Sequence, residues 1–166
     1  MEEQITNWLN THKEIAIYAV PVFAFLEACV GIGLFVSGVI LLSICTLLYT
    51  QEIATLAQMI PLAFLGALAG DHSGYLMGRL IGPKFHHTKF AIQHQDNIEK
   101  ADKLILNYGI YAILIGRLLP AIRSIIPLIT GIGGMSKRRY LGFDVLACMI
   151  WASLLGVLVV GLDSLF

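Results

Sequence analysis

The residues Gly116 to Met135 read G-R-L-L-P-A-I-R-S-I-I-P-L-I-T-G-I-G-G-M, and this stretch decides the fold. It ends an apolar block from Leu104 to Met135, which is too long for one membrane-spanning helix of about 20 residues and too short for two. Pro120, Pro127 and the glycine-rich run 131–134 break helices. We therefore expect a re-entrant hairpin of two half-helices, whose irregular backbone needs protein or a wet cavity around it.

The composition places this hairpin in a membrane protein. The chain has 166 residues, of which 57% are hydrophobic and 13% are charged, and its mean hydropathy is +0.79. Soluble proteins carry about 25% charged residues, and a small soluble fold must cover a large surface with polar groups. A soluble enzyme is therefore excluded. The net charge of zero gives no field that would attract nucleic acid.

Three more apolar blocks surround the hairpin, and they predict an all-α polytopic protein of one domain, 1–166. The first block, 15–50, is interrupted by Pro21 and several glycines and predicts a second hairpin. The expected order is hairpin, span, linker, hairpin, span, with inverted topology between the halves. The expected boundaries are a surface-lying amphipathic segment 1–14 in place of a signal peptide, a first repeat 15–78, a cytoplasmic linker 79–103 and a second repeat 104–166.

Basic residues flank the Leu104–Met135 block on both sides. Eight of the eleven are Arg79, Lys84, Lys89, Lys100, Lys103, Lys137, Arg138 and Arg139. A single crossing would put positive clusters on both faces of the membrane, against the positive-inside tendency. A hairpin keeps all eight on the cytoplasmic side, which favours that topology.

Four charged residues fall inside the apolar blocks: Glu27, Asp71, Arg117 and Arg123. On insertion scales, a charge at the centre of a spanning helix costs about 2.5–3.5 kcal/mol, so four unpaired charges would cost on the order of 10 kcal/mol. That sum is comparable to the whole stability of a small domain. These residues must pair with one another as structural ion bridges or line a polar site.

The two arginines stand six residues apart with Pro120 midway between them. On a straight helix they would point about 120° apart, but a break at the proline can turn both guanidiniums into one cavity. Two arginine forks suit a phosphate, because each can donate bidentate, charge-assisted bonds. Glu27, from the other hairpin, could carry a proton or pair with these arginines when the site is empty.

Glycines recur every four residues in the second block and predict a ridge for close helix packing. They are Gly66, Gly70, Gly74, Gly78 and Gly82. Beside the ridge, Asp71, Tyr75 and Arg79 form one polar stripe. We expect this stripe to orient the arginine hairpin, with proton relay as an alternative role.

The cysteines and histidines give little support for a metal. Cys29, Cys45 and Cys148 lie in apolar runs without C-x-x-C spacing and are expected to be small buried residues. The histidines of the linker, His86, His87 and His94, lack accompanying cysteines or regularly spaced carboxylates. We expect no metal site and no cofactor.

Three motifs together resemble the DedA family of bacterial membrane proteins, part of the SNARE-associated Golgi protein (VTT domain) superfamily. They are Phe25-Leu26-Glu27, the block G-D-H-S-G-Y-L-M-G-R at 70–79, and the 116–135 stretch with its R-x-x-P-x-x-R element. The resemblance covers residues 21 to 161. It implies an inner-membrane location, undecaprenyl phosphate recycling, transport driven by the proton-motive force, and phospholipid scrambling in eukaryotic relatives.

Carried over by position, the resemblance assigns functional roles to Glu27, Arg117 and Arg123, and links Asp71 to the Gly-Asp block. Many members have Pro-Gly-Asp twelve residues after the glutamate, where this chain has Ser37-Gly38-Val39. Val39 cannot bind a proton, so this chain lacks an acid that could couple transport to protons at that position. Many members also continue into a further C-terminal helix.

These observations predict a transporter that moves undecaprenyl phosphate or a related phospholipid between leaflets, and not an enzyme. Arg117 and Arg123 would bind the lipid phosphate and Glu27 and Asp71 would couple protons or ions, with Tyr75, Arg79, Pro120 and Gly131 supporting them. Membrane lipids and protons are the expected partners; nucleic acid is not, and a homo-oligomer stays open. The alternatives are an uncoupled scramblase, a non-transporting assembly factor and an intramembrane lipid phosphatase. The only hint of the phosphatase is His72 beside Asp71 and Ser73.

Overall fold

The computed structural model describes residues 13–34, 38–120 and 122–164, and within these ranges the chain forms helices and turns without strands. The elements are α2 (Lys13–Ala16), α3 (Ala19–Ala28), η1 (Ile32–Leu34), α4 (Gly38–Thr50), α5 (Leu56–Ile81), η2 (Gly82–His87), α6 (Lys89–Gln93), α7 (Gln95–Tyr108), η3 (Gly109–Tyr111), α8 (Ala112–Arg117), α9 (Ile126–Ile132) and α10 (Lys137–Asp163). The all-α prediction is confirmed for this part of the chain. The predicted amphipathic segment, apart from Lys13 and Glu14, lies outside the described residues.

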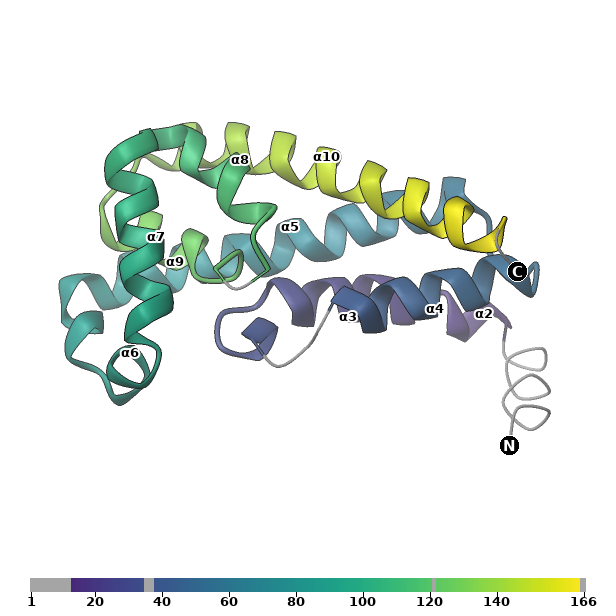
Figure 1. Cartoon of the computed structure of the whole chain (residues 1–166), viewed down its shortest axis with the longest axis horizontal. Helices are drawn as coiled ribbons and strands as arrows, with labels where there is room; N and C mark the ends of the chain where they lie inside the picture. Colours follow the sequence, from purple (N-terminus) through teal and green to yellow (C-terminus); the bar gives the residue numbers. More distant parts are fainter. Residues whose placement is uncertain (1–12, 35–37, 121, 165–166) are drawn as a thin grey trace.

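Two long helices, α5 and α10, run antiparallel along the molecule (Figure 1). A capping box starts α5: the Thr55 backbone N–H donates to Gln58 Oε1 at 3.0 Å. Within the described residues, α10 is the one helix both long and apolar enough to cross a membrane. The helix α5 is nearly as long, with 26 residues against 27, but its last turns carry the polar stripe.

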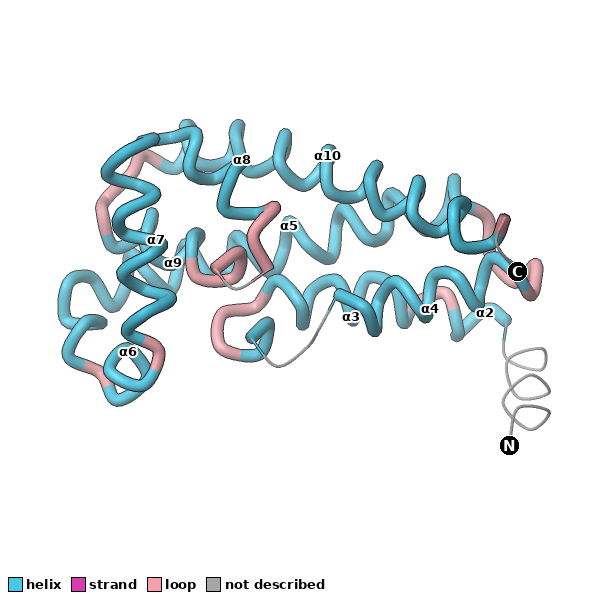
Figure 2. Tube along the Cα trace, in the orientation of Figure 1, coloured by secondary structure: helices cyan, strands magenta, loops and turns pink. Residues whose placement is uncertain are grey.

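The chain reverses direction at both places that the sequence predicts. One reversal lies between α3 and α4, and the other lies between α8 and α9, at residues 118–120 and 122–125. The two open toward opposite ends of the molecule, and their tips lie near the middle of its long axis (Figures 1 and 2). The two connections therefore meet at mid-length, beside α5 and α10.

The glycine ridge of α5 packs against both reversals. A Cβ atom at Gly66 would meet the backbone carbonyl of Pro21 in α3, and one at Gly78 would meet the carbonyl of Leu128 in α9. Gly131 of α9 approaches the backbone of α5 in return. Close packing of this kind is what holds helices together in lipid, where apolar burial alone gives little driving force.

Two sequence expectations about the polar region need correction. Gly82 does not continue the ridge: it caps the C-terminus of α5 with φ of 61°, and nothing lies within 4 Å of a Cβ placed there. The stretch 79–103 is also more than a linker, because it includes the end of α5, all of α6 and most of α7. The helix α7 crosses the predicted boundary at Leu104, and it buries Ile98 and Ala101. The second hairpin is therefore shorter than predicted.

The basic residues that are expected on the cytoplasmic side lie together at one end of the molecule. The end of α5, the helices α6 and α7, and the start of α10 all lie there (Figure 1). Together with η2, which contains Lys84, these elements carry the eight basic residues that flank the hairpin. Both ends of the 104–135 block thus lie at the same end of the protein.

Candidate functional site

The reversal between α8 and α9 brings the two arginines together, as the position of Pro120 predicts. The helix α8 ends at Arg117, and the following turns place Arg123 on the facing side of the loop. Both side chains line one small cavity together with Glu27, Asp71 and Trp151. The cavity volume is about 10 Å³, which is room for roughly one water molecule.

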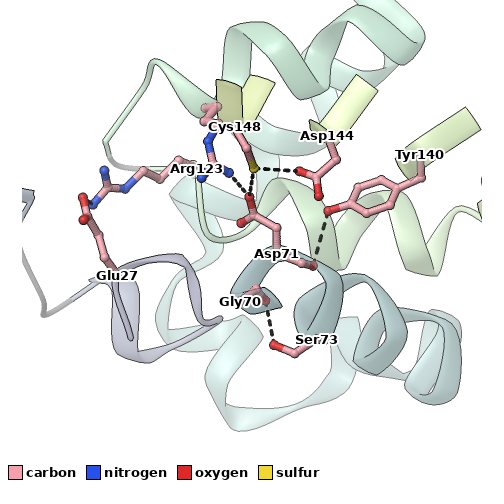
Figure 3. A network of polar contacts seen from close by, with 9 residues as sticks. Glu27, Gly70, Asp71, Ser73, Arg123, Tyr140, Asp144 and Cys148 are labelled. Atoms are coloured by element: carbon pink, nitrogen blue, oxygen red, sulfur yellow. Dashed lines mark hydrogen bonds and ion pairs between the residues drawn. The ribbon is translucent and has the colours of Figure 1, made fainter. Parts of the chain in front are cut away.

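Each arginine forms an ion pair with a buried acid. Arg117 pairs with Asp71, with 9% and 2% of the two side chains exposed. Arg123 pairs with Glu27, with 13% and 3% exposed (Figure 3). Pairing offsets part of the cost of placing four charges in an apolar block. The counter-ion of Arg123 is therefore Glu27, and the counter-ion of Arg117 is Asp71 from α5.

The arginines are not fully satisfied by these acids. The Nε–H groups of Arg117 and Arg123 are buried and have no hydrogen-bond acceptor within the described residues. The two carboxylate oxygens of Glu27 at the same cavity also lack hydrogen-bond partners within the described residues. Buried polar groups in folded proteins nearly always have a partner, so this cavity has unused capacity for a polar ligand. The Arg117 guanidinium carbon lies 5.3 Å from the ring centroid of Trp151. This cation–π contact helps to hold the guanidinium in place.

An apolar groove of about 290 Å³ leads away from the arginines. Its polar end is formed by Glu27, Arg117 and Arg123. The rest of its wall comes from α4, the turn after α8 and α10, namely Gly38, Val39, Leu42, Leu118, Pro120, Trp151, Leu154, Leu155 and Leu158. A charged end and a long hydrocarbon-lined wall match an amphiphile better than a free inorganic ion.

Three residues predicted to support the site lie outside the cavity. The Tyr75 hydroxyl donates to the carbonyl of Met135 at 2.6 Å, and Arg79 donates to the Tyr75 oxygen at 3.2 Å. Gly131 permits the close contact between α9 and α5. These contacts fasten the connection between α9 and α10 to α5, so they act on the position of the hairpin and not on a ligand.

The helix α10 contributes residues to the site that the sequence did not predict. Asp144 is 1% exposed, and the Cys148 sulfur lies 3.9 Å from Asp144 Oδ1 and 3.7 Å from Asp71 Oδ2 (Figure 3). The Tyr140 hydroxyl donates to the Asp71 carbonyl at 3.3 Å. Cys45 packs in the apolar core as expected, but Cys148 contacts two carboxyls. The spacing 140, 144, 148, 151 marks one helical face and could have revealed this group.

The remaining candidates do not join the cavity. Ser73 donates its hydroxyl proton to the Gly70 carbonyl at 2.6 Å, and the His72 ring lies 6.2 Å from that of Tyr75. The hint of a Ser–His pair therefore has no counterpart in the geometry. The side chains of His86 and His87 lie outside the described residues.

Residues 17–160 match the family model of the VTT domain. The chain belongs to the VTT domain family. It is 28% identical over 149 residues to Protein DedA of Escherichia coli K12, a match covering 84% of this chain and 68% of that one. This confirms the resemblance to DedA proteins.

Other relatives agree with this assignment. An uncharacterized membrane protein of Mycobacterium leprae is 34% identical over 118 residues, which are 69% of this chain and 51% of that protein. The inner membrane protein YabI of Escherichia coli K12 is 20% identical over 152 residues, covering 91% and 59%. The chain spans half to two thirds of the length of these relatives. No solved structure matches it. The chain is a membrane protein of the DedA type.

Proposed function

We propose that this protein moves a lipid phosphate, undecaprenyl phosphate or a related phospholipid, between the leaflets of the bacterial inner membrane. The observation that carries the proposal is the pair of buried arginines, each with an unpartnered Nε–H, at the polar end of an apolar groove. Arginine forks bind phosphate bidentately. The groove would take the hydrocarbon chain, so one continuous surface suits both parts of the lipid.

Binding would require the arginines to exchange partners. The cavity between the four charged side chains holds roughly one water molecule, which is too little space for a phosphate group. The phosphate would therefore replace Glu27 and Asp71 as the partner of the guanidiniums. The released carboxylates could then take up protons, which is the coupling role we propose for both.

The membrane arrangement we propose is multi-pass, with α5 and α10 crossing and the two chain reversals re-entering from opposite faces. The opposed orientation of the reversals and their meeting at mid-length support this arrangement. Inverted repeats with a site near the midplane are a recurring transporter design. The end of the molecule that carries α6 and α7 would be cytoplasmic, because the basic residues gather there.

The proposal is tested by flux of a short-chain polyprenyl phosphate in liposomes that contain the purified protein, with and without a pH gradient. We expect flux that rises with the gradient in the parent, is lost in Arg123→Gln, and is unchanged in Arg139→Gln, which alters an exposed arginine at the start of α10. Flux that ignores the gradient would favour the uncoupled scramblase. Absence of flux in the parent would favour the assembly factor.

A binding measurement separates a ligand site from a structural one. The lipid should raise the Tm of the parent by mass action and leave the Tm of Arg123→Gln unchanged at matched folding. Equal stabilisation of both proteins would show that Arg123 is structural. Release of inorganic phosphate from the lipid by the parent protein would show an enzyme instead.

A further inference from the structure

The buried site holds one acid more than it holds bases. Three carboxyls are almost fully buried, those of Glu27, Asp71 and Asp144, with 2%, 1% and 1% of each residue exposed. Arg123 pairs with Glu27 and Arg117 with Asp71, so within the described residues Asp144 has no cation of its own. An ionised Asp144 would be an uncompensated buried charge, which proteins strongly avoid. The charges balance only when this site binds one proton.

The geometry around Asp144 shows where that proton would lie. A carboxyl oxygen of Asp71, one of Asp144 and the Cys148 sulfur all lie within 4.8 Å of one another. The second oxygen of Asp144, Oδ2, is buried, and the Tyr140 hydroxyl lies beside it (Figure 3). Two carboxyls this close in a dry setting do not readily ionise together and tend to share a proton. The thiol between them is a further donor and acceptor (Figure 3).

We propose that Asp71 and Asp144 form a proton-binding carboxyl pair, with one proton resident on Asp144, and that Arg117 links this pair to anion binding. The link rests on the proposed function. When Arg117 turns toward a phosphate, Asp71 loses its counter-charge and the pair binds a second proton. By linkage, protonation of the pair then favours anion binding to the same extent.

Asp144 lies on α10, where it contacts the Cys148 thiol next to Asp71. The charged and titratable side chains facing Asp144 are Tyr140 and Cys148 on α10, Asp71 on α5 and Arg117 on α8. The helix α4 has no charged residue, and η3 offers only Tyr111, whose ring packs on Phe143. The carboxyl pair suits a proton better than a metal ion, because Asp71 already forms an ion pair with the Arg117 guanidinium.

Infrared difference spectroscopy tests the resident proton without any ligand. The parent protein in liposomes at neutral pH should show the carbonyl band of a protonated carboxyl. The band should disappear in Asp144→Asn, which imitates the neutral acid and should fold, and persist in Asp163→Asn, a change at the far end of the same helix. The assignment is overturned if the parent lacks the band, if Asp144→Asn keeps it, or if the parent binds Zn²⁺ in a way that Asp144→Asn abolishes.

Calorimetric titration tests the link to the anion. Short-chain polyprenyl phosphate is titrated into the protein in buffers of different ionisation enthalpy, which reports the protons taken up on binding. The parent should take up protons, Asp71→Asn should bind the lipid with reduced uptake because Asp71 receives the second proton, and Asp163→Asn should match the parent. Lipid binding without proton uptake by the parent overturns the link and leaves the proposed function standing. No lipid binding by the parent overturns the proposed function, while the infrared band still decides the proton site.

Discussion

Replacing one partner of the Arg123–Glu27 ion pair strands the other charge in the core, and the size of the effect follows from its burial. Arg123→Met leaves the Glu27 carboxylate, whose side chain is 3% exposed. Glu27→Leu leaves the Arg123 guanidinium, which is 13% exposed and lines the groove. The arginine can reach water more easily, but the acid can take up a proton while the guanidinium stays charged, so the two losses should be similar.

Breaking a buried pair costs about 3–5 kcal/mol. We expect both Arg123→Met and Glu27→Leu to lie within that range. Either loss is a large fraction of the about 5–15 kcal/mol that stabilises a folded domain. The double variant removes both charges, and replacement of a buried pair by apolar residues is often neutral. Its stability should lie within about 1 kcal/mol of the parent.

The measurement is a double-mutant cycle of unfolding free energy in detergent micelles. The matched control is the exposed pair of Glu99 and Lys103, 3.4 Å apart, with 53% and 71% of the side chains exposed. Lys103→Met should cost less than about 0.5 kcal/mol. Additive losses in the double variant would refute the pairing. A double variant that folds normally but moves no lipid would assign the pair to function as well as to structure.

Three further outcomes are expected. Cysteines placed at 100 and 137, in place of Lys100 and Lys137, should react with an impermeant reagent from the same side of the membrane; labelling from opposite sides would contradict the hairpin. Gly74→Leu should lower thermal stability by about 1–3 kcal/mol through overpacking, because a Cβ there lies 2.8 Å from Val30 Cγ2; Leu at the exposed position Gln93 is the control, and equal stability of both would place the ridge against lipid. Arg117→Lys keeps the charge but loses the planar fork, so flux should fall strongly, and unchanged flux would argue against a phosphate clamp.

The sequence by itself determined the membrane class, the two chain reversals and the meeting of the arginines. These features depend on local chemistry: the high fraction of hydrophobic residues, the missing N–H of Pro120, and the glycine spacing of α5. A proline between two arginines breaks the helix wherever the rest of the chain lies. The convergence of Arg117 and Arg123 could therefore be predicted without knowing what surrounds them.

Only the tertiary structure decided which acid pairs with which arginine and that Asp144 joins the site. Glu27 and Asp71 were both available to either arginine, and the choice depends on how α3 and α5 pack against the turn after α8. Asp144 lies seven residues after Lys137 along α10, and nothing in the sequence near it indicates a partner. The crossing of α10 over α5 buries it beside Asp71 instead. Burial and ion pairing depend on distances between residues far apart in the chain, which hydropathy and spacing do not determine.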